Sequence, residues 1–451
     1  MSETIAAIAT PPGEGGVGLV RISGSEAGRV LKECFVDARG RRRAVFQPRR
    51  LYLGFIINQA GERVDQVLAV YMPRPYSYTG EDVVEISGHG GPLVMRELLN
   101  VVLSHGVRLA DPGEFTQRAF LAGKIDLTQA EAVIDLIRAK SRSALRQAER
   151  HLEGELSRAI GEVRERLLGL LAQIAVSLDY PEEDLPELAI ETMGAEVDAA
   201  LWRLNELLET SFAGRVLREG LNVVIVGRPN VGKSSLLNRL TGKQRAIVTE
   251  VPGTTRDVID EFFLIDGIPI RLVDTAGIRV TDDPVERIGV NLAEEALQQA
   301  DLALVILDQS VPLEDEDRQI LTLTGARPRI VVCNKIDLPQ AADLPTGHEM
   351  VPVSARTGEG IEVLRQRIAN FVLAGKLQPD SLMIVNTRQE QLLRQAISAL
   401  QDVRRGLDEG AMPDMLEIDL RAAWESLGVM IGEAVREDVV REIFARFCVG
   451  K

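Results

Sequence analysis

The residues whose chemistry is easiest to interpret form a glycine-rich run, residues 227–234, that ends in lysine and serine. The run matches GxxxxGK(S/T) and directly follows the apolar residues 221–226. Such a turn between a strand and a helix wraps backbone N–H groups around phosphates at the helix N-terminus. The run therefore predicts a phosphate-binding loop, in which Lys233 reaches the β- and γ-phosphates of a nucleotide and the Ser234 hydroxyl ligates Mg²⁺.

Two further motifs could act on the same phosphates. Residues 274–277, Asp-Thr-Ala-Gly, end an apolar run. Asp274 is then placed to hold a water of the magnesium ion, and the Gly277 N–H lies near the γ-phosphate. Thr254 and Thr255 lie earlier in the chain, and either can supply the threonine of a loop that closes over the magnesium ion.

A third motif, residues 334–337 (Asn-Lys-Ile-Asp), suits recognition of a base. The Asp337 carboxylate can accept from both the N1–H and the 2-amino group of guanine. Adenine lacks that amino group, so the pairing selects guanine. Ser354 and Ala355 would support the guanine oxygen through backbone N–H groups. Taken in this order, the motifs resemble those of the GTPase family of P-loop proteins, and the expected nucleotide is GTP.

One position departs from the pattern of Ras-like GTPases, which carry a water-orienting glutamine after the Asp-x-x-Gly motif. Here that position is Ile278, which cannot hydrogen-bond through its side chain. The attacking water must therefore be positioned from elsewhere. Asp282, Asp283, Glu286 and Arg287 lie just downstream, and the alternative for any one of them is a solvated surface charge.

The N-terminal region contains two runs that invite a ligand. Residues 13–18 match GxGxxG, but residues 19–22 after them are typical of a strand. A dinucleotide fingerprint must open a helix, so we reject that interpretation. The arginine-rich residues 39–43, with Arg49 and Arg50, favour a solvated loop, and contact with RNA phosphates is the alternative.

Apolar periodicity indicates how these motifs are positioned. Residues 1–118 mix strand and helix patterns, with strands expected at 4–10, 19–22 and 64–71. Residues 123–218 and those after 388 show helical spacing. Between them, residues 221–375 alternate apolar strands with helices, which predicts a parallel sheet covered on both faces. We therefore expect a multidomain α/β chain in which an α/β domain interrupts a helical domain.

Composition limits the function classes. The 451 residues carry a net charge of −15, so any RNA partner must meet a local basic patch. The longest apolar stretch is too short to span a bilayer, and the N-terminus lacks the pattern of a secretory signal. Three cysteines imply no disulfide framework. These features predict a cytoplasmic protein without a membrane partner. Four histidines and the lack of CxxC and HExxH make a zinc site improbable.

The chain as a whole resembles the MnmE (TrmE) family of tRNA modification GTPases. The resemblance covers essentially all residues, and it includes the GTPase motifs and the terminal Cys-Val-Gly-Lys. Its other motifs are residues 9–18, 78–85, 88–92 and 112–120. It implies four segments: an N-terminal α+β domain for tetrahydrofolate binding and dimerisation, the first part of a helical bundle, an inserted Ras-like GTPase domain with a mainly parallel sheet, and the second part of the bundle. Their expected bounds are 1–118, 119–217, 218–376 and 377–451.

The resemblance also implies an activity. Members of the family hydrolyse GTP with K⁺ activation, form homodimers, and join the partner MnmG, which carries FAD and uses NADH, in a heterotetramer. Together they add a carboxymethylaminomethyl or aminomethyl group to carbon 5 of the wobble uridine of certain tRNAs. The carbon comes from a tetrahydrofolate one-carbon derivative, expected to be the 5,10-methylene or the 5-formyl form.

Site residues follow from the same resemblance, position by position. Glu286 would position the attacking water, Lys233 and Asp274 would act at the phosphates, and Cys448 matches a cysteine needed for modification. Mg²⁺ would be held by Ser234 and Thr255. The K⁺ positions are Asn230, Thr249, Val251 and Thr254, and the folate positions are Arg21, Glu85, Lys124 and Lys451. The GTP-binding positions are Asn230, Val231, Gly232, Lys233, Ser234, Ser235, Thr249, Glu250, Val251, Pro252, Gly253, Thr254, Thr255, Asp274, Thr275, Ala276, Gly277, Asn334, Lys335, Asp337, Ser354, Ala355 and Arg356.

Two alternatives stay open. A ribosome-assembly GTPase of the Era or Der type would share the phosphate loop, but it would carry a KH domain or a second GTPase domain. The sequence contains a single GxxxxGKS and no suitable KH loop. A regulatory GTPase with a vestigial folate domain is the other alternative, and Arg21, Glu85, Lys124 and Lys451 weigh against it.

Overall fold

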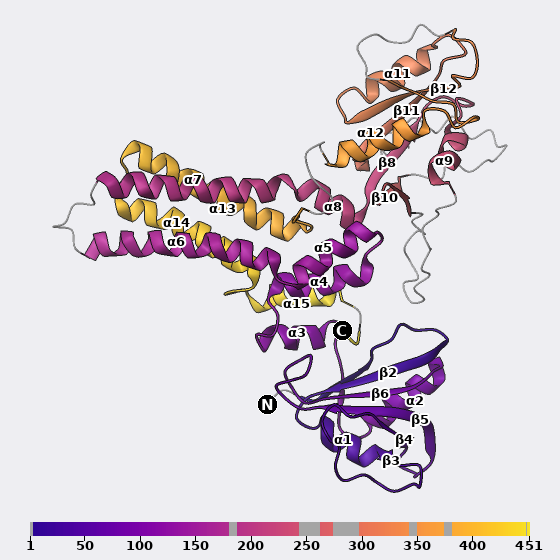
Figure 1. Cartoon of the computed structure of the whole chain (residues 1–451), viewed down its shortest axis with the longest axis vertical. Coiled ribbons are helices and arrows are strands. Elements are labelled where there is room, and N and C mark those ends of the chain that lie inside the picture. The colour runs from indigo at the N-terminus through magenta and orange to yellow at the C-terminus, as the bar shows by residue number, and fades with distance from the viewer. Residues whose placement is uncertain are drawn as a thin grey trace.

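Figure 1 shows the computed structural model of the chain, in which a sheet domain at the N-terminus, a long helical bundle and a second sheet domain follow one another in space. The structure describes residues 3–179, 187–242, 262–273, 297–341, 350–373, 381–447 and 449–451. The C-terminus lies beside the N-terminal domain, far from the second sheet (Figure 1).

The N-terminal domain is built on a seven-stranded sheet in the order β3-β4-β5-β6-β2-β1-β7, with one parallel pair, β1 with β7. Its elements are β1 (Ile5–Ile8), β2 (Gly15–Ser23), α1 (Ala27–Cys34), β3 (Phe35–Val36), β4 (Tyr52–Ile57), β5 (Arg63–Met72), β6 (Val83–Gly90), α2 (Pro92–Leu103) and β7 (Arg108–Leu109). One face carries alternate apolar residues such as Val20, Ile22 and Ile86, and these are buried in a core shared with α1 and α2. The strands expected at 4–10, 19–22 and 64–71 are confirmed.

Strand β2 decides the meaning of the GxGxxG run. It begins at Gly15, inside the run, and pairs antiparallel with β6. No helix opens there, so the rejection of a dinucleotide site is confirmed. An added Cβ at Gly18 would meet Met95 Cγ at 2.7 Å, which shows that this glycine allows α2 to approach the strand closely.

Helical segments before and after the second sheet pack against one another in two apolar cores. They comprise α3 (Glu114–Leu121), α4 (Leu127–Arg138), α5 (Arg142–Leu152), α6 (Glu155–Asp179), α7 (Glu187–Glu209), α13 (Thr387–Glu409), α14 (Pro413–Ile431) and α15 (Glu437–Ala445). Leu156, Ile160 and Leu167 of α6 are spaced by whole turns and are fully buried against α13 and α14 residues such as Leu400 and Leu420. The expectation that an α/β domain interrupts a helical domain is therefore confirmed.

The interrupting domain holds a six-stranded sheet in the order β13-β12-β11-β8-β10-β9. Its elements are α8 (Ser211–Glu219), β8 (Leu221–Val226), α9 (Lys233–Thr241), β9 (Phe262–Ile265), β10 (Ile268–Leu272), β11 (Leu302–Asp308), α11 (Asp315–Leu323), β12 (Arg329–Asn334), β13 (Met350–Pro352) and α12 (Ile361–Leu373). Every strand pair is parallel except β9 with β10, and separate apolar cores lie on the two faces. The predicted parallel sheet is confirmed.

The described residues contain neither a membrane-spanning helix nor a cluster of metal-binding side chains. Among them, no helix is both long enough and apolar enough for a membrane span. Within the same ranges, no group of three or more His, Cys, Asp or Glu side chains is arranged to hold a metal ion.

Candidate functional site

The predicted phosphate loop connects the end of β8 to the start of α9, as its sequence required. Gly227 and Gly232 both have positive φ, at 156° and 99°. An added Cβ at Gly227 would lie 2.6 Å from the Ile306 carbonyl oxygen, and one at Gly232 would overlap the side-chain amide of Asn334. These glycines therefore let the loop lie against β11 and β12, directly before the N-terminus of α9, where backbone N–H groups can bind an anion.

The two cations of this loop, Lys233 and Arg228, are held by hydrogen bonds and ion pairs. Lys233 Nζ donates to the carbonyl oxygens of Gly227, at 2.7 Å, and Arg228, at 2.9 Å, so the ammonium lies over the loop. Arg228 forms ion pairs with Glu314 and Asp317, which anchor the loop to the start of α11. Ser234, in the first turn of α9, is half-buried. This arrangement of backbone donors, an ammonium and a hydroxyl fits a nucleotide polyphosphate with its magnesium ion.

Asn334 joins the phosphate loop to the predicted base-binding residues. It is 2% exposed, and its Nδ2 donates to the Val231 carbonyl at 2.7 Å. Its Oδ1 accepts from the Ala355 N–H at 3.0 Å. The Asn334 side chain thus fixes the position of the loop after β13 relative to the phosphate loop. Asn334 acts here as a brace between two loops.

Asp337 lies beside Ser354, as base recognition requires. Ser354 Oγ donates to Asp337 Oδ1 at 2.7 Å, and this hydrogen bond holds the Asp337 pKa below its usual value. The carboxylate is therefore ionised and can accept two N–H groups of a guanine edge. The predicted Arg356 is 83% exposed on its side chain and approaches Asp337 only to 3.8 Å, so it contributes little to this geometry.

Asp308 and Arg239, which the sequence did not single out, support the base-binding loops. Lys335, which has a positive φ of 67°, forms an ion pair with Asp308 at the end of β11. Burial alone would raise the Asp308 pKa, but hydrogen bonds from Lys335 and Ser310 outweigh it and the pKa is lowered. Arg239 of α9 donates to the Ala355 carbonyl at 3.0 Å. Asp308 directly follows the apolar residues 302–307, and a polar residue at the carboxyl end of a strand was the sequence signal that could have indicated a role at the site.

Several predicted residues lie outside the described residues. They are Thr249, Glu250, Val251, Pro252, Gly253, Thr254, Thr255, Asp274, Thr275, Ala276, Gly277, Glu286 and Cys448. The structure thus brings together Asn230, Val231, Gly232, Lys233, Ser234, Ser235, Asn334, Lys335, Asp337, Ser354, Ala355 and Arg356, around the phosphate loop and the loops after β12 and β13.

A second cluster lies on the other face of the N-terminal sheet, opposite α1 and α2. Arg21 of β2 and Glu85 of β6 are direct partners in the antiparallel register, and Arg21 Nη2 and Glu85 Oε1 are 2.8 Å apart. The Arg21 guanidinium lies 5.7 Å from the ring centroids of both Tyr78 and Phe115. A cation, a carboxylate and two aromatic rings are thus gathered in one place, a donor set that fits a flat heterocycle bearing N–H groups and carboxylates.

The C-terminal tail reaches this cluster. Arg21 Nη1 lies 3.4 Å from the Gly450 carbonyl oxygen, and the Phe115 N–H donates to the Lys451 carbonyl at 3.2 Å. Gly450 has a φ of 94° and is buried against β1, where an added Cβ would lie 2.8 Å from the Ala9 Cα. The last two residues are therefore docked beside Arg21, although they are over 400 positions away in sequence.

Lys124 contacts the turn that precedes Tyr78 of this cluster. Its Nζ donates to the carbonyl oxygens of Pro75 and Ser77, both at 2.8 Å. It therefore fixes the turn that presents Tyr78, whose hydroxyl is hydrogen-bonded to Thr116. Tyr78 and Phe115 were not assigned to the site from sequence. Both belong to motifs of the family resemblance, at 78–85 and 112–120, and those motifs were the signal.

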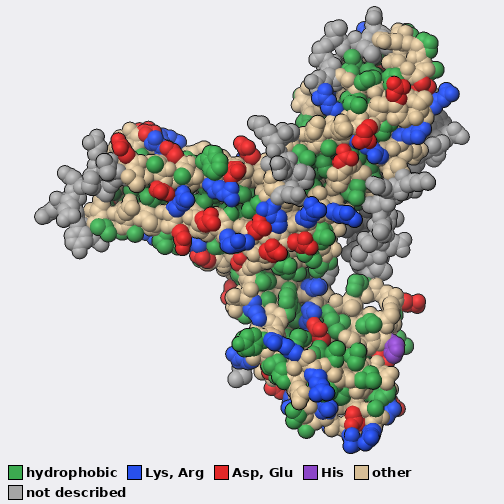
Figure 2. Space-filling model, viewed as in Figure 1, with side chains coloured by type: hydrophobic (Ala, Val, Ile, Leu, Met, Phe, Trp, Pro, Cys, Tyr) green, Lys and Arg blue, Asp and Glu red, His purple; other side chains and the backbone are tan. Residues whose placement is uncertain are grey.

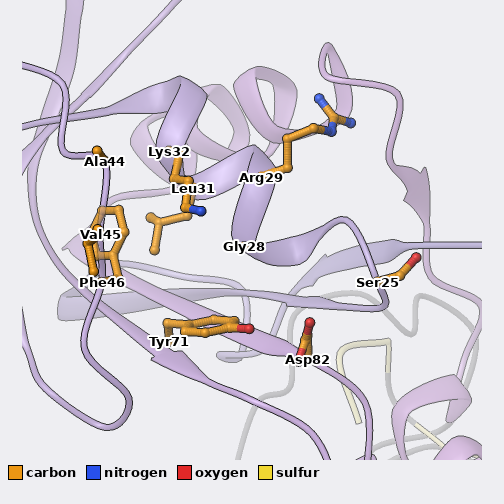
Figure 3. A pocket seen from close by; sticks show the side chains of 10 residues that line it. All are labelled: Ser25, Gly28, Arg29, Leu31, Lys32, Ala44, Val45, Phe46, Tyr71 and Asp82. Atoms are coloured by element: carbon orange, nitrogen blue, oxygen red, sulfur yellow. The ribbon is translucent and has the colours of Figure 1, made fainter.

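A separate pocket of about 260 Å³ lies between α1, Tyr71 of β5 and residues 44–46, as Figure 3 shows. None of the described residues predicted for the nucleotide or the folate lines it.

Comparison with known proteins extends over the whole chain. A family model described as the GTP-binding protein TrmE N-terminus matches residues 4–124, and one described as the MnmE helical domain matches residues 127–448. A protein named tRNA modification GTPase MnmE from Symbiobacterium thermophilum is 48% identical over 456 residues, covering 100% of this chain and 99% of that protein. A protein of the same name from Heliobacterium modesticaldum is 47% identical over 465 residues, covering 100% of both. The solved G domain of the T. maritima FeoB iron transporter is 25% identical and covers 34% of this chain and 98% of that chain, with a TM-score of 0.24.

Proposed function

Because the chain belongs to the MnmE family of tRNA modification GTPases, we propose that it is a K⁺-activated GTP hydrolase that modifies the wobble uridine of tRNA. With MnmG, which supplies FAD, it would add a carboxymethylaminomethyl or aminomethyl group to carbon 5 of that base. The carbon would come from a 5,10-methylene- or 5-formyl-tetrahydrofolate. The observation that carries the proposal is the joint presence of a braced guanine-nucleotide site and an Arg21–Glu85 cluster closed by the C-terminal tail.

GTP binding and hydrolysis follow from the phosphate loop. Lys233 and the N–H groups of the loop bind the β- and γ-phosphates, and Asp337 selects guanine. Ser234 would hold Mg²⁺ together with Thr255, and the magnesium ion would offset phosphate charge in the transition state. Asp274 and Glu286, which lie outside the described residues, would hold the magnesium-bound water and position the attacking water.

A bound K⁺ would supply the positive charge that other GTPases take from an arginine finger. We assign it to Asn230, Thr249, Val251 and Thr254. Asn230 supports the assignment because it stands in the phosphate loop with a φ of 62°, a conformation that asparagine adopts more readily than most residues. Its side-chain oxygen can act as a ligand of the hard-cation type.

Folate binding is assigned to Arg21, Glu85, Lys124 and Lys451. Glu85 would accept N–H groups of the pterin, and Arg21 and Lys451 would attract the glutamate carboxylates. Lys124 would position the Tyr78 turn, given its two hydrogen bonds to carbonyl oxygens there. Cys448, three residues before the C-terminus, would be carried to the cluster by the docked tail and act in the modification.

The β4–β5 part of the N-terminal sheet supports a homodimer through the face opposite α1 and α2. Leu53 and Leu68 are direct partners across β4 and β5, point away from the α1 and α2 core, and are 59% and 42% exposed. An apolar strip of this kind is typical of an interface. The domain bounds 1–118, 119–217, 218–376 and 377–451 and the heterotetramer with MnmG belong to the same proposal.

Nucleoside mass spectrometry of total tRNA tests the proposal. Cells lacking the chain would be compared with cells given it back, intact or as Asp274→Ala. We expect the modified wobble uridine to vanish without the chain and to return only with the intact form. Identical nucleosides in all three would refute the modification role and would favour the alternative, a ribosome-assembly or regulatory GTPase of the Era or Der type.

A further inference from the structure

The arginine-rich run forms one edge of the N-terminal domain. We call Arg39, Arg42, Arg43, Arg49 and Arg50 the arginine edge; all five lie between β3 and β4. β3 is the end strand of the sheet, and within the described parts of the chain no further strand pairs with it on this side. Figure 2 shows several Lys and Arg side chains at the lower end of the molecule, where Figure 1 places β3.

Ion pairs do not compensate the positive charge of the arginine edge within the described residues. Among the described residues, none of its five members has a carboxylate within ion-pair distance, whereas Arg41 in the same segment pairs with Asp37 at 2.9 Å. Exposed arginines of the helical bundle, such as Arg394 and Arg421, pair with glutamates one turn away. A chain with a net charge of −15 thus holds a local concentration of uncompensated positive charge at this edge.

Aromatic rings lie beside three of these five guanidinium groups. Arg43 lies 4.3 Å and Arg50 5.8 Å from the centroid of the Tyr52 ring. Arg49 lies 5.5 Å from the Tyr76 ring and donates to the Tyr76 carbonyl at 3.3 Å. Contacts of this kind restrain the side chains. Arg50 also donates to Gln47 Oε1 at 3.0 Å, and the other exposed N–H groups of these arginines suit the binding of phosphate oxygens.

The surface continues into the pocket of Figure 3. Residues 44–46, between Arg43 and Arg49, form one wall, and α1 forms another. Lys32 of α1 lines the pocket and, within the described part of the chain, has no ion-pair partner. Arg29 beside it is neutralised by Glu26 and Glu33. Lys32 therefore adds a positive charge on the α1 side of this pocket, while Asp82 contributes a carboxylate elsewhere in its lining.

We propose that the arginine edge, with Lys32, binds the phosphate backbone of RNA and holds the tRNA on this chain. The inference rests on the proposed function, which supplies a polyanionic substrate to an acidic protein. Charge repulsion over most of the surface makes a local cationic contact necessary for binding. Arginine is the residue suited to paired contacts with phosphate, and the run of five along one edge suits a continuous backbone rather than a single anion.

The test is the salt dependence of tRNA binding by the full-length chain. The probe is a fluorescent tRNA transcript with uridine at the wobble position, and the variant is Arg39→Gln/Arg42→Gln/Arg50→Gln. Loss of three phosphate contacts should weaken binding about tenfold or more near 0.1 M salt and lower the slope of log K against log salt by about 2 to 3. A matched control, Arg394→Gln/Arg405→Gln/Arg421→Gln, removes the same charge from the helical bundle and should leave both quantities nearly unchanged.

Unchanged affinity and slope in the arginine-edge variant would overturn the inference, as would an equal loss in the control. Competition by polyglutamate as strong as by RNA would also overturn it, in favour of an acidic protein partner. Folate binding and GTP hydrolysis of the variant should match those of the parent, which separates a lost contact from a lost fold. A chain that binds tRNA through these arginines but leaves cellular nucleosides unchanged would overturn the proposed function alone.

Discussion

Asn334 and Val231 are hydrogen-bonded to each other across the nucleotide site, with Nδ2 donating to a carbonyl oxygen at 2.7 Å. The same side chain accepts from Ala355. The phosphate loop and the base-binding loop are therefore positioned relative to one another by a single buried amide. The distance between the two ends of the nucleotide site depends on this residue as much as on the residues that contact the ligand.

Replacing Asn334 by alanine should therefore loosen the whole site. The change removes two hydrogen bonds and leaves the Val231 carbonyl without a partner, at a cost of about 1–3 kcal/mol. We expect guanine-nucleotide affinity to fall about tenfold or more, measured by fluorescence titration with a labelled GDP. Asn205→Ala, which removes an exposed hydrogen bond in the helical bundle, is the control. Equal affinity in both variants would contradict the bracing role.

Asp337→Asn should change the base that the site prefers. The carboxylate presents two acceptors, whereas an amide presents one acceptor and one donor. We expect GTP binding to weaken about 100-fold or more, since an amide N–H then faces an N–H group of the guanine edge, and xanthosine triphosphate to bind better than GTP. Competition titrations with GTP and xanthosine triphosphate measure this change in base preference. Retained preference for GTP would show that Asp337 does not read the base.

The monovalent cation should control hydrolysis through Asn230. Exchange of K⁺ for Na⁺ at constant ionic strength should slow GTP turnover by about tenfold or more, because the smaller ion fits a K⁺ ligand set poorly. Asn230→Ala should remove most of the difference between the two salts while nucleotide binding persists. Turnover rates that are the same in both salts for the parent chain would refute the cation site.

Deleting Lys451 should weaken folate binding. The tail is docked by the Arg21 contact to Gly450 and by the Phe115 bond to the Lys451 carbonyl, so its loss removes a cation and opens the cluster. We expect an affinity loss of about tenfold by calorimetry with 5-formyl-tetrahydrofolate, with GTP hydrolysis nearly intact. Gly450→Val, which places a side chain against β1, should have a similar effect. Unchanged folate affinity in both would contradict the assignment.

Local motifs were readable from sequence because their residues are neighbours in the chain. Residues 227–234 form the loop that their glycines predicted, and the apolar runs around them form the expected parallel sheet. The Arg21–Glu85 pair was assigned only through family resemblance, since the register of β2 with β6 joins residues 64 positions apart. The docking of Gly450 beside Arg21 likewise joins residues that are distant in the sequence. Strand β9 was missed although Asp266 and Gly267, with φ of 50° and 82°, form a typical hairpin turn.

The stability of the helical domain should depend on pH through His151. This residue of α5 is buried, and its Nε2 lies 2.8 Å from the Met383 carbonyl oxygen just before α13, so the neutral ring donates there. Burial lowers the His151 pKa from 6.5 to about 4. The folded state thus binds its proton less readily than the unfolded state. Its contribution to stability is complete above pH 6.5 and is lost as the pH falls from 6.5 towards 4.

His151→Gln should remove this dependence, because the glutamine amide can donate to Met383 without titrating. The difference in unfolding free energy between parent and variant should therefore shift by up to about 3 kcal/mol between pH 7.5 and pH 4, with the parent losing more. Urea unfolding followed by tryptophan fluorescence measures it locally, since both tryptophans, Trp202 and Trp424, lie in the helical domain. A parallel pH profile for parent and His151→Gln would show that the buried ring does not couple folding to protonation.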